Sequence, residues 1–270
     1  MSAFFAARPE GQPGLALFLN AGDPPLDVFR ELVLMLDELR VDCLELAVPF
    51  PNSASDGPVI RESASRALAD GIDREAVFAF VADVRPELVH LKIALLADWS
   101  HSIKRTPLPD FLAMVKASGA DGLLVHGLPP RLREQYYAAA ADAGQPIVTT
   151  CYATSEPEVL TDAAEHGSAY IYLVAAYGRS GTVGPPDLST LGPVLDTLRA
   201  QTSVPIAVGF GVKTREHIDG LGAVGADAAI VGSTCVARVT EARAAGRDVV
   251  DDFRQLVADL SPTPQARSDP

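Results

Sequence analysis

Residues 15–50 read LALFLNAGDPPLDVFRELVLMLDELRVDCLELAVPF, and this stretch decides the fold. It begins and ends with apolar runs of strand length, LALFLN at 15–20 and CLELAVPF at 43–50. Between them, DVFRELVLMLDELR has apolar residues at three- and four-residue spacing, which is the period of an amphipathic helix. Nearly continuous apolar strands that are joined by a helix form parallel β-α-β units, with both faces of the sheet buried.

The same unit repeats along the chain. Helical patterns such as PDFLAMVKASG and REQYYAAAADAG separate the later apolar runs. The eight runs lie at 15–20, 43–50, 91–97, 122–127, 146–151, 169–175, 205–210 and 228–233. Eight units predict a single-domain (β/α)8 TIM barrel over residues 1–260, in preference to an open doubly wound sheet. We also expect an extra helix between the second and third strands and a disordered tail at 261–270.

Composition narrows the classes of partner. The net charge of -13 disfavours binding to nucleic acid and to anionic membranes, although backbone amides can still hold a small phosphate. The N-terminus lacks the apolar core of a signal peptide, and no apolar run is long enough to span a bilayer. We therefore predict a cytoplasmic protein. Its three cysteines lie in or beside apolar runs far apart in sequence, as expected of reduced core thiols.

Two acids stand out near the end of the second predicted strand. Strand alternation puts Cys43, Glu45 and Ala47 on one face, and if that face is the barrel lumen, Glu45 points into its upper layer. A buried carboxylate without a partner is costly, so a partner must neutralise it or its pKa must be raised for proton transfer. Asp56, in the following loop, can reach the same end of the barrel. At this point a structural ion pair and a catalytic pair fit equally well.

Glycine-rich segments follow the sixth, seventh and eighth strands. Gly211, Gly232 and Ser233 can present backbone N–H groups at the start of the next helix. The segment YGRSGTVGPP after the sixth strand adds three glycines. Late loops of a TIM barrel commonly hold phosphate, so we predict a phosphate site here, with tight turns and helix caps as the alternative.

Several of these segments together resemble the tryptophan synthase alpha subunit family over roughly residues 14–240. They are LFLNAGDP, LELAVPFPNSASDGPVIRESASRAL, YIYLVAAYGRSG, VGFGV and AIVGS. The resemblance implies a TIM barrel that cleaves indole-3-glycerol phosphate to indole and glyceraldehyde 3-phosphate by a retro-aldol reaction. It also implies that the reaction needs no metal, no imine and no cofactor.

The resemblance assigns roles to individual residues. Glu45 matches the family's glutamate that moves protons at the ring carbon and the side-chain hydroxyl, and Asp56 matches the aspartate that stabilises the ring nitrogen. Tyr172 matches a tyrosine beside that glutamate. The predicted phosphate ligands are Gly181, Gly211, Gly232 and Ser233, together with Ser180, which keeps a hydroxyl where threonine is usual. The neighbouring Arg179 either adds a phosphate contact or points to solvent.

Other positions depart from the family pattern. His126 replaces a small alanine, Thr149 replaces an isoleucine, and Asp98 replaces a tyrosine, so we predict a more polar pocket. The predicted substrate pocket comprises Phe18, Asn20, Asp98, Leu124, His126, Thr149 and Phe210. The expected partner is a phosphorylated small molecule. Asn52 and Ser53 replace the family's Asp-Pro that reaches the beta subunit, which makes pairing with a beta subunit doubtful.

Three alternatives accompany this interpretation. The same acid pair could act on a different substrate in a specialised pathway, or the chain could be a non-catalytic alpha-like partner subunit. An imine-forming aldolase fits poorly, because no lysine lies on the sixth strand and Lys92 is at the start of the third.

Overall fold

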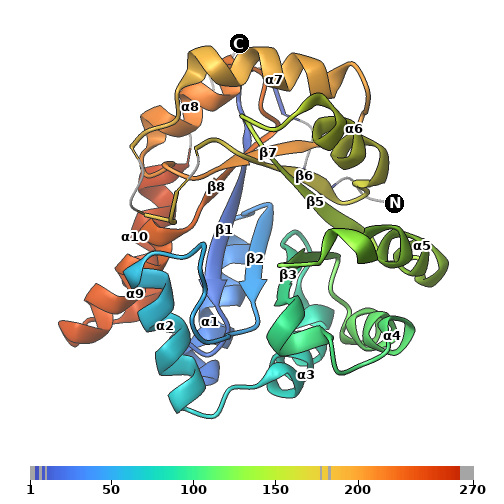
Figure 1. Cartoon of the computed structure of the whole chain (residues 1–270). Coiled ribbons are helices and arrows are strands. Elements are labelled where there is room, and N and C mark those ends of the chain that lie inside the picture. Colours follow the sequence, from blue (N-terminus) through green and yellow to red (C-terminus); the bar gives the residue numbers. More distant parts are fainter. Residues whose placement is uncertain (1–3, 6–7, 10, 177, 182–183, 262–270) are drawn as a thin grey trace.

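The computed structural model describes residues 4–5, 8–9, 11–176, 178–181 and 184–261. Eight parallel strands form a closed barrel in chain order, and β8 pairs with β1 to close it (Figure 1). The strands are β1 Gly14–Asn20, β2 Cys43–Ala47, β3 Lys92–Asp98, β4 Gly122–His126, β5 Ile147–Tyr152, β6 Tyr170–Val174, β7 Ile206–Gly209 and β8 Ala228–Val231. The predicted (β/α)8 fold is confirmed, while the expected disorder of the tail falls almost entirely outside the described residues.

Helices surround the barrel. They are α1 Leu26–Glu38, α2 Pro58–Ala69, α3 Arg74–Val84, α4 Leu108–Ser118, α5 Arg133–Ala143, α6 Pro157–His166, α7 Leu188–Arg199, α8 Arg215–Ala223, α9 Ser233–Ala244 and α10 Val249–Leu260. Three single-turn segments add to these: η1 Arg85–Glu87, the π-helical η2 Trp99–Ile103 and η3 Pro130–Leu132. The extra helix expected between β2 and β3 is present, because both α2 and α3 lie there. None of the described helices is long and apolar enough to cross a membrane.

The apolar residues form an outer and an inner core. The outer core lies between the strands and the helices, where β-strand side chains pack against α-helical ones. The inner core fills the lumen with Ala16, Cys43, Ala94, Leu124, Val148, Tyr170, Ala207, Ala228 and Ile230. Many of these side chains are small, and they leave room for the large ring of Tyr170, which is fully buried.

The lower part of the lumen is filled by aromatic rings. Phe4 and Phe5 belong to the inner core, and their ring centroids lie 5.1 and 5.4 Å from that of Tyr170. A TIM barrel filled in this way is a packed core and not a pore. A cavity lies near the carboxyl ends of the strands, where the loops meet. The three cysteines are buried and unpaired, as predicted.

Candidate active site

Glu45 lies on the luminal face of β2, the face that strand alternation assigns to Cys43, Glu45 and Ala47 together. Its side chain is buried, and Tyr170 Oη donates a hydrogen bond of 2.6 Å to Glu45 Oε1. Burial raises the pKa of the Glu45 carboxyl to about 7, although the hydrogen bond from Tyr170 acts in the opposite direction. A carboxyl with this pKa can both give and accept a proton near neutral pH.

Asp56 and Tyr172 line the same cavity as Glu45. Burial, followed by the negative charges of Glu45 and Asp56, raises the pKa of the Tyr172 phenol, so both acids lie close enough to act on it. The ring of Tyr172 also fills the space over β7: a Cβ atom on Gly209 would lie 2.4 Å from Tyr172 Oη. Glycine at 209 is therefore what lets this tyrosine enter the cavity. The three predicted catalytic residues converge on one site.

The glycine-rich segments also converge there. Gly181, Gly211, Gly232 and Ser233 line the cavity, and α9 begins at Ser233. Gly211 has a positive φ of 82°, and a Cβ at this residue would lie 2.1 Å from the carbonyl oxygen of Gly184. Backbone N–H groups and the helix dipole at such a helix start favour an anion. The predicted residues are thus brought together in a form that can hold a phosphate.

Ser180 connects the loop after β6 to the loop after β2. Its backbone N–H donates to the carbonyl oxygen of Ser55 at 3.0 Å. Its hydroxyl accepts from the backbone N–H of Gly57 at 3.0 Å and donates to Asp56 Oδ1 at 3.2 Å. Ser180 lines the cavity, so this predicted phosphate ligand also fixes the position of the Asp56 carboxylate.

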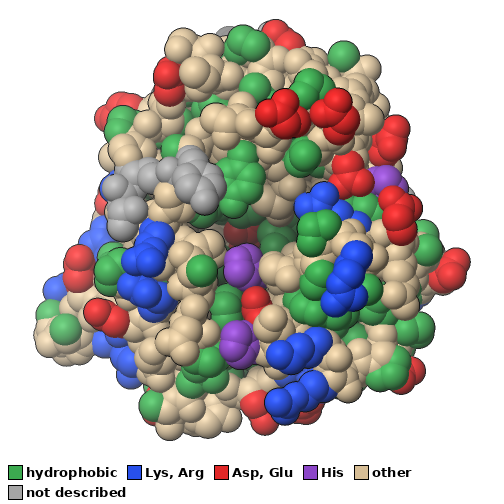
Figure 2. Space-filling view, in the orientation of Figure 1, with side chains coloured by type: hydrophobic (Ala, Val, Ile, Leu, Met, Phe, Trp, Pro, Cys, Tyr) green, Lys and Arg blue, Asp and Glu red, His purple; other side chains and the backbone are tan. Residues whose placement is uncertain are grey.

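Five of the seven residues predicted to form the substrate pocket lie at the cavity. Phe18, Asn20, Leu124, His126 and Phe210 line the cavity. Phe210 has a positive φ of 70°, an uncommon conformation for a bulky residue, and such strain is concentrated at functional sites. Figure 2 shows histidine side chains at a hollow in the face that it views.

Thr149 and Asp98 do not line the cavity. Thr149 points outward, where its hydroxyl donates to the carbonyl oxygen of Ala163 at 2.8 Å. Because side chains alternate along β5, the neighbouring Thr150 faces the cavity instead. The prediction therefore chose the wrong one of two adjacent threonines. Asp98 lies behind His126 and is connected to the cavity by its hydrogen bond with the His126 ring.

Asp98 is the centre of a polar network at the ends of β3 and β4. Its Oδ2 lies 3.0 Å from His126 Nδ1, and its Oδ1 lies 2.6 Å from His101 Nδ1. His126 Nε2 lies 3.1 Å from the hydroxyl of Ser55, which also lines the cavity. Burial alone would raise the pKa of Asp98, but hydrogen bonds from His126 and His101 outweigh it and lower the pKa to about 2.

Sequence reasoning missed several residues of this site, among them Tyr170, Ser55 and Phe50. Tyr170 is two positions before Tyr172, and strand alternation could have placed both in the lumen. Ser55 precedes Asp56 directly, but no pattern in the sequence predicts its contact with His126. Phe50 stacks on the rings of both His101 and His126, at centroid distances of 5.5 and 5.7 Å.

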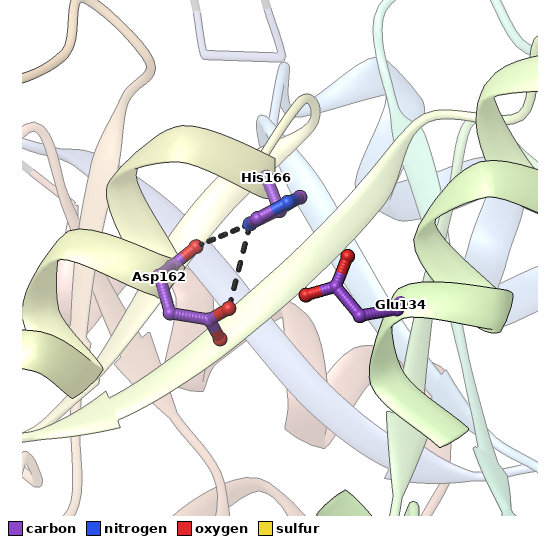
Figure 3. Close-up of side chains that lie close together, drawn as sticks. All are labelled: Glu134, Asp162 and His166. Carbon is purple, nitrogen blue, oxygen red and sulfur yellow. Dashed lines mark hydrogen bonds and ion pairs between the residues drawn. The ribbon is translucent and has the colours of Figure 1, made fainter. Parts of the chain in front are cut away.

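A group of potential metal ligands lies away from the cavity, on α5 and α6 (Figure 3). It consists of Glu134, Asp162 and His166. Tyr137 Oη donates to Asp162 Oδ2 at 3.0 Å, and the Tyr137 ring stacks on His166 with centroids 4.1 Å apart. Arg133 adds an ion pair to Asp162 at 3.7 Å. These contacts tie α5 to α6 and partly neutralise Asp162, so we assign the group a structural role.

Comparison with known proteins places this site in a family. The family model described as "Tryptophan synthase alpha chain" matches residues 4–263. The alpha chain of Synechocystis is 35% identical over 243 residues, covering 89% of this chain and 90% of that protein. The alpha chain of Gloeobacter violaceus is 38% identical over 219 residues, covering 81% and 78%.

A solved structure agrees with the sequence comparison. The tryptophan synthase alpha-subunit of Pyrococcus furiosus has a TM-score of 0.81 and 31% sequence identity, covering 93% of this chain and 98% of its own. The family match spans nearly the whole barrel and includes every strand that contributes to the cavity. The chain belongs to the tryptophan synthase alpha chain family.

Proposed function

We propose that this chain is a lyase that cleaves indole-3-glycerol phosphate, or a related phosphorylated compound with a more polar ring, and releases glyceraldehyde 3-phosphate. Membership of a lyase family supports the reaction class. The observation that carries the proposal is Glu45, a buried carboxyl with a pKa of about 7 in one cavity with Asp56 and the glycine loops.

Glu45 and Asp56 have different roles in the proposed reaction. Protonated Glu45 gives its proton to the ring carbon that bears the side chain, and the Asp56 carboxylate stabilises the cationic ring nitrogen that results. Glu45, now ionised, takes the proton of the adjacent side-chain hydroxyl. The carbon–carbon bond breaks, its electron pair returns to the ring, and the aldehyde leaves. A pKa near 7 makes both forms of Glu45 available without a large energetic cost.

This reaction needs neither an imine nor a metal. Among the described residues that line the cavity there is no lysine to form a Schiff base. The proton on Glu45 is the only electrophile that the ring carbon requires. The remote phosphate, held by the loop amides, contributes binding energy that orients the reacting bond.

The ring end of the cavity favours a polar relative of indole as a second candidate substrate. His126, Thr150 and Tyr152 line the cavity beside the apolar Leu96 and Leu124. A hydroxyl or carbonyl substituent on the ring could form hydrogen bonds with these polar side chains, whereas an unsubstituted apolar ring could not.

We further propose that the chain acts without a beta subunit. One Pyrococcus furiosus structure is of the tryptophan synthase α2β2 complex, so a relative assembles in this way. In this chain Asn52 and Ser53 change the loop expected to reach such a partner, and Ser53 is buried and lies 3.3 Å from the Ser55 hydroxyl. Ser55 in turn contacts His126 on β4 and Ser180 in the loop after β6, so the loop is held against its own barrel.

The test is to incubate the purified chain alone with indole-3-glycerol phosphate and with its ring-hydroxylated analogue, and to follow release of glyceraldehyde 3-phosphate. We expect Glu45→Gln to lower turnover at least about 100-fold, because it cannot transfer the proton. The variant should still bind glycerol 3-phosphate in a calorimeter, since the phosphate loops are unchanged. Release that is unaffected by Glu45→Gln, or no release from either compound, would overturn the proposal and favour a non-catalytic subunit.

A further inference from the structure

The Asp98 network contains an arrangement that the lyase reaction does not use. Ser55, His126 and Asp98 stand in the order hydroxyl, imidazole, carboxylate, on three different loops or strand ends. We propose that they form a second catalytic centre, in which Ser55 is a nucleophile toward carboxylic esters. This centre depends on the same cavity but not on Glu45, so it stands independently of the proposed lyase activity.

The distances fit nucleophile activation. Ser55 Oγ lies 3.1 Å from His126 Nε2, and His126 Nδ1 lies 3.0 Å from Asp98 Oδ2. Hydrogen bonds from two imidazoles keep Asp98 ionised, so it accepts from the Nδ1–H of His126. The lone pair of Nε2 is then directed at the Ser55 hydroxyl, which is the tautomer that a general base requires.

The three groups are held in place by neighbours. The backbone N–H of His101 donates to Asp98 Oδ1 at 3.0 Å, and Phe50 stacks on the His126 ring at an interplanar angle of 29°. The carbonyl oxygen of Ser55 accepts from Ser180 N–H at 3.0 Å. A nucleophile and base that are fixed by such supporting contacts lose little entropy on reaching the reactive geometry.

The centre is open to a ligand. Ser55 and His126 both line the cavity, and the side chain of His126 is 34% exposed. Leu96 and Leu124 provide an apolar wall for an acyl chain. The backbone N–H of Asp56, the residue after the nucleophile, occupies the chain position from which serine hydrolases take an oxyanion-hole donor.

The proposed reaction has two steps, acylation of Ser55 and hydrolysis of the acyl-serine. Ser55 Oγ attacks the ester carbonyl carbon while its proton passes to His126 Nε2. The bond from the acyl carbon to the leaving oxygen breaks, and His126 returns the proton to the departing alcohol. Water, deprotonated by His126, then attacks the acyl-serine, which releases the acid and regenerates Ser55.

The test uses the full-length protein and two probes that do not require the lyase reaction. A fluorophosphonate should label Ser55, as located by peptide mass spectrometry, and p-nitrophenyl acetate should be hydrolysed with an initial burst. Ser55→Ala should abolish both signals. His126→Gln should slow labelling at least about 100-fold, because the general base is lost. Ser65→Ala, a matched control that removes an exposed serine hydroxyl on α2, should keep labelling within about twofold of the unchanged protein.

Several results would overturn the proposal. These are no adduct, an adduct on a different serine, labelling of Ser55 that His126→Gln does not slow, or ester hydrolysis that survives Ser55→Ala. Glu45→Gln separates the two proposals, because it should remove retro-aldol turnover and leave Ser55 labelling. Failure of the lyase assay together with normal Ser55 labelling would therefore reject only the first proposal.

Discussion

Two buried carboxyls on neighbouring strands behave in opposite ways. Glu45 on β2 is 2% exposed and Asp98 on β3 is 5% exposed, yet the pKa of Glu45 is raised to about 7 and that of Asp98 is lowered to about 2. Burial acts in the same direction on both, since it disfavours the charged form. Glu45 lies deeper in the barrel than Asp98, so burial raises its pKa more strongly, and the groups that surround each carboxyl add to the difference.

The two carboxyls differ in the hydrogen-bond donors that surround them. Among the described residues, Glu45 accepts one hydrogen bond, from the neutral phenol of Tyr170, in a lumen filled with small apolar side chains. Asp98 accepts from the rings of His126 and His101 and from the backbone N–H of His101. The first environment produces a group that exchanges protons near neutral pH, and the second produces a permanent anion. These are the properties that the two proposed roles need.

Substitution of Glu45 should have the largest effect on the stability of the protein. Its pKa is raised in the folded state, so the folded protein is penalised as pH rises from about 4.5 through about 7. Glu45→Gln removes that penalty and should stabilise the protein by up to about 3 kcal/mol at pH 8.5, with almost no gain at pH 4.5. Urea unfolding at both pH values measures this. An equal change in stability at the two values would contradict the assignment.

Substitution of Asp98 should change the stability of the protein in the opposite direction. The pKa of Asp98 is lowered, so its contribution to stability is complete above pH 3.8 and is lost as pH falls through about 2. Asp98→Asn should therefore destabilise the protein by about 2 kcal/mol at pH 7, because hydrogen bonds to an ion are replaced by weaker neutral ones. Chemical unfolding is the measurement. Asp110→Asn, at an exposed position on α4, should be within about 0.5 kcal/mol of neutral.

Substitution of Tyr170, which donates a hydrogen bond to Glu45, should have the smallest of these effects. The hydrogen bond from Tyr170 lowers the pKa of Glu45, so Tyr170→Phe should raise it further, by roughly one unit or less. If protonated Glu45 begins the reaction, the alkaline limb of the kcat/KM profile should move to higher pH by the same amount. A limb that stays in place, or moves to lower pH, would argue against Glu45 as the acid.

Tyr136→Phe provides the matched control for that experiment. Tyr136 is also buried, but its hydroxyl has no hydrogen-bond partner among the described residues. Removing a hydroxyl that makes no bond should leave the pH profile unchanged and should not destabilise the fold.

The adjacent threonines of β5 mark the limit of prediction within a single strand. Thr149 and Thr150 have the same side chain, and the segment PIVTTC does not alternate in polarity, so nothing local indicates which one faces the lumen. The structure turns Thr150 toward the cavity and gives Thr149 a helix carbonyl as its partner. In β2 the single charge at Glu45 and the following Asp56 made the assignment possible.

The sequence by itself determined the barrel, the shared face of Cys43, Glu45 and Ala47 in the second strand, and the convergence of the glycine-rich loops. These follow from hydrophobic periodicity and from the rule that strand ends of a barrel share one face, both of which are local or topological properties. Only the tertiary structure decided the charge state of the two carboxyls and the contact of Ser55 with His126 and Asp98. A pKa and a hydrogen bond depend on distances of a few ångströms between residues 55, 98 and 126. The pairing of β2, β3 and β4 and the path of the loop after β2 bring those residues together.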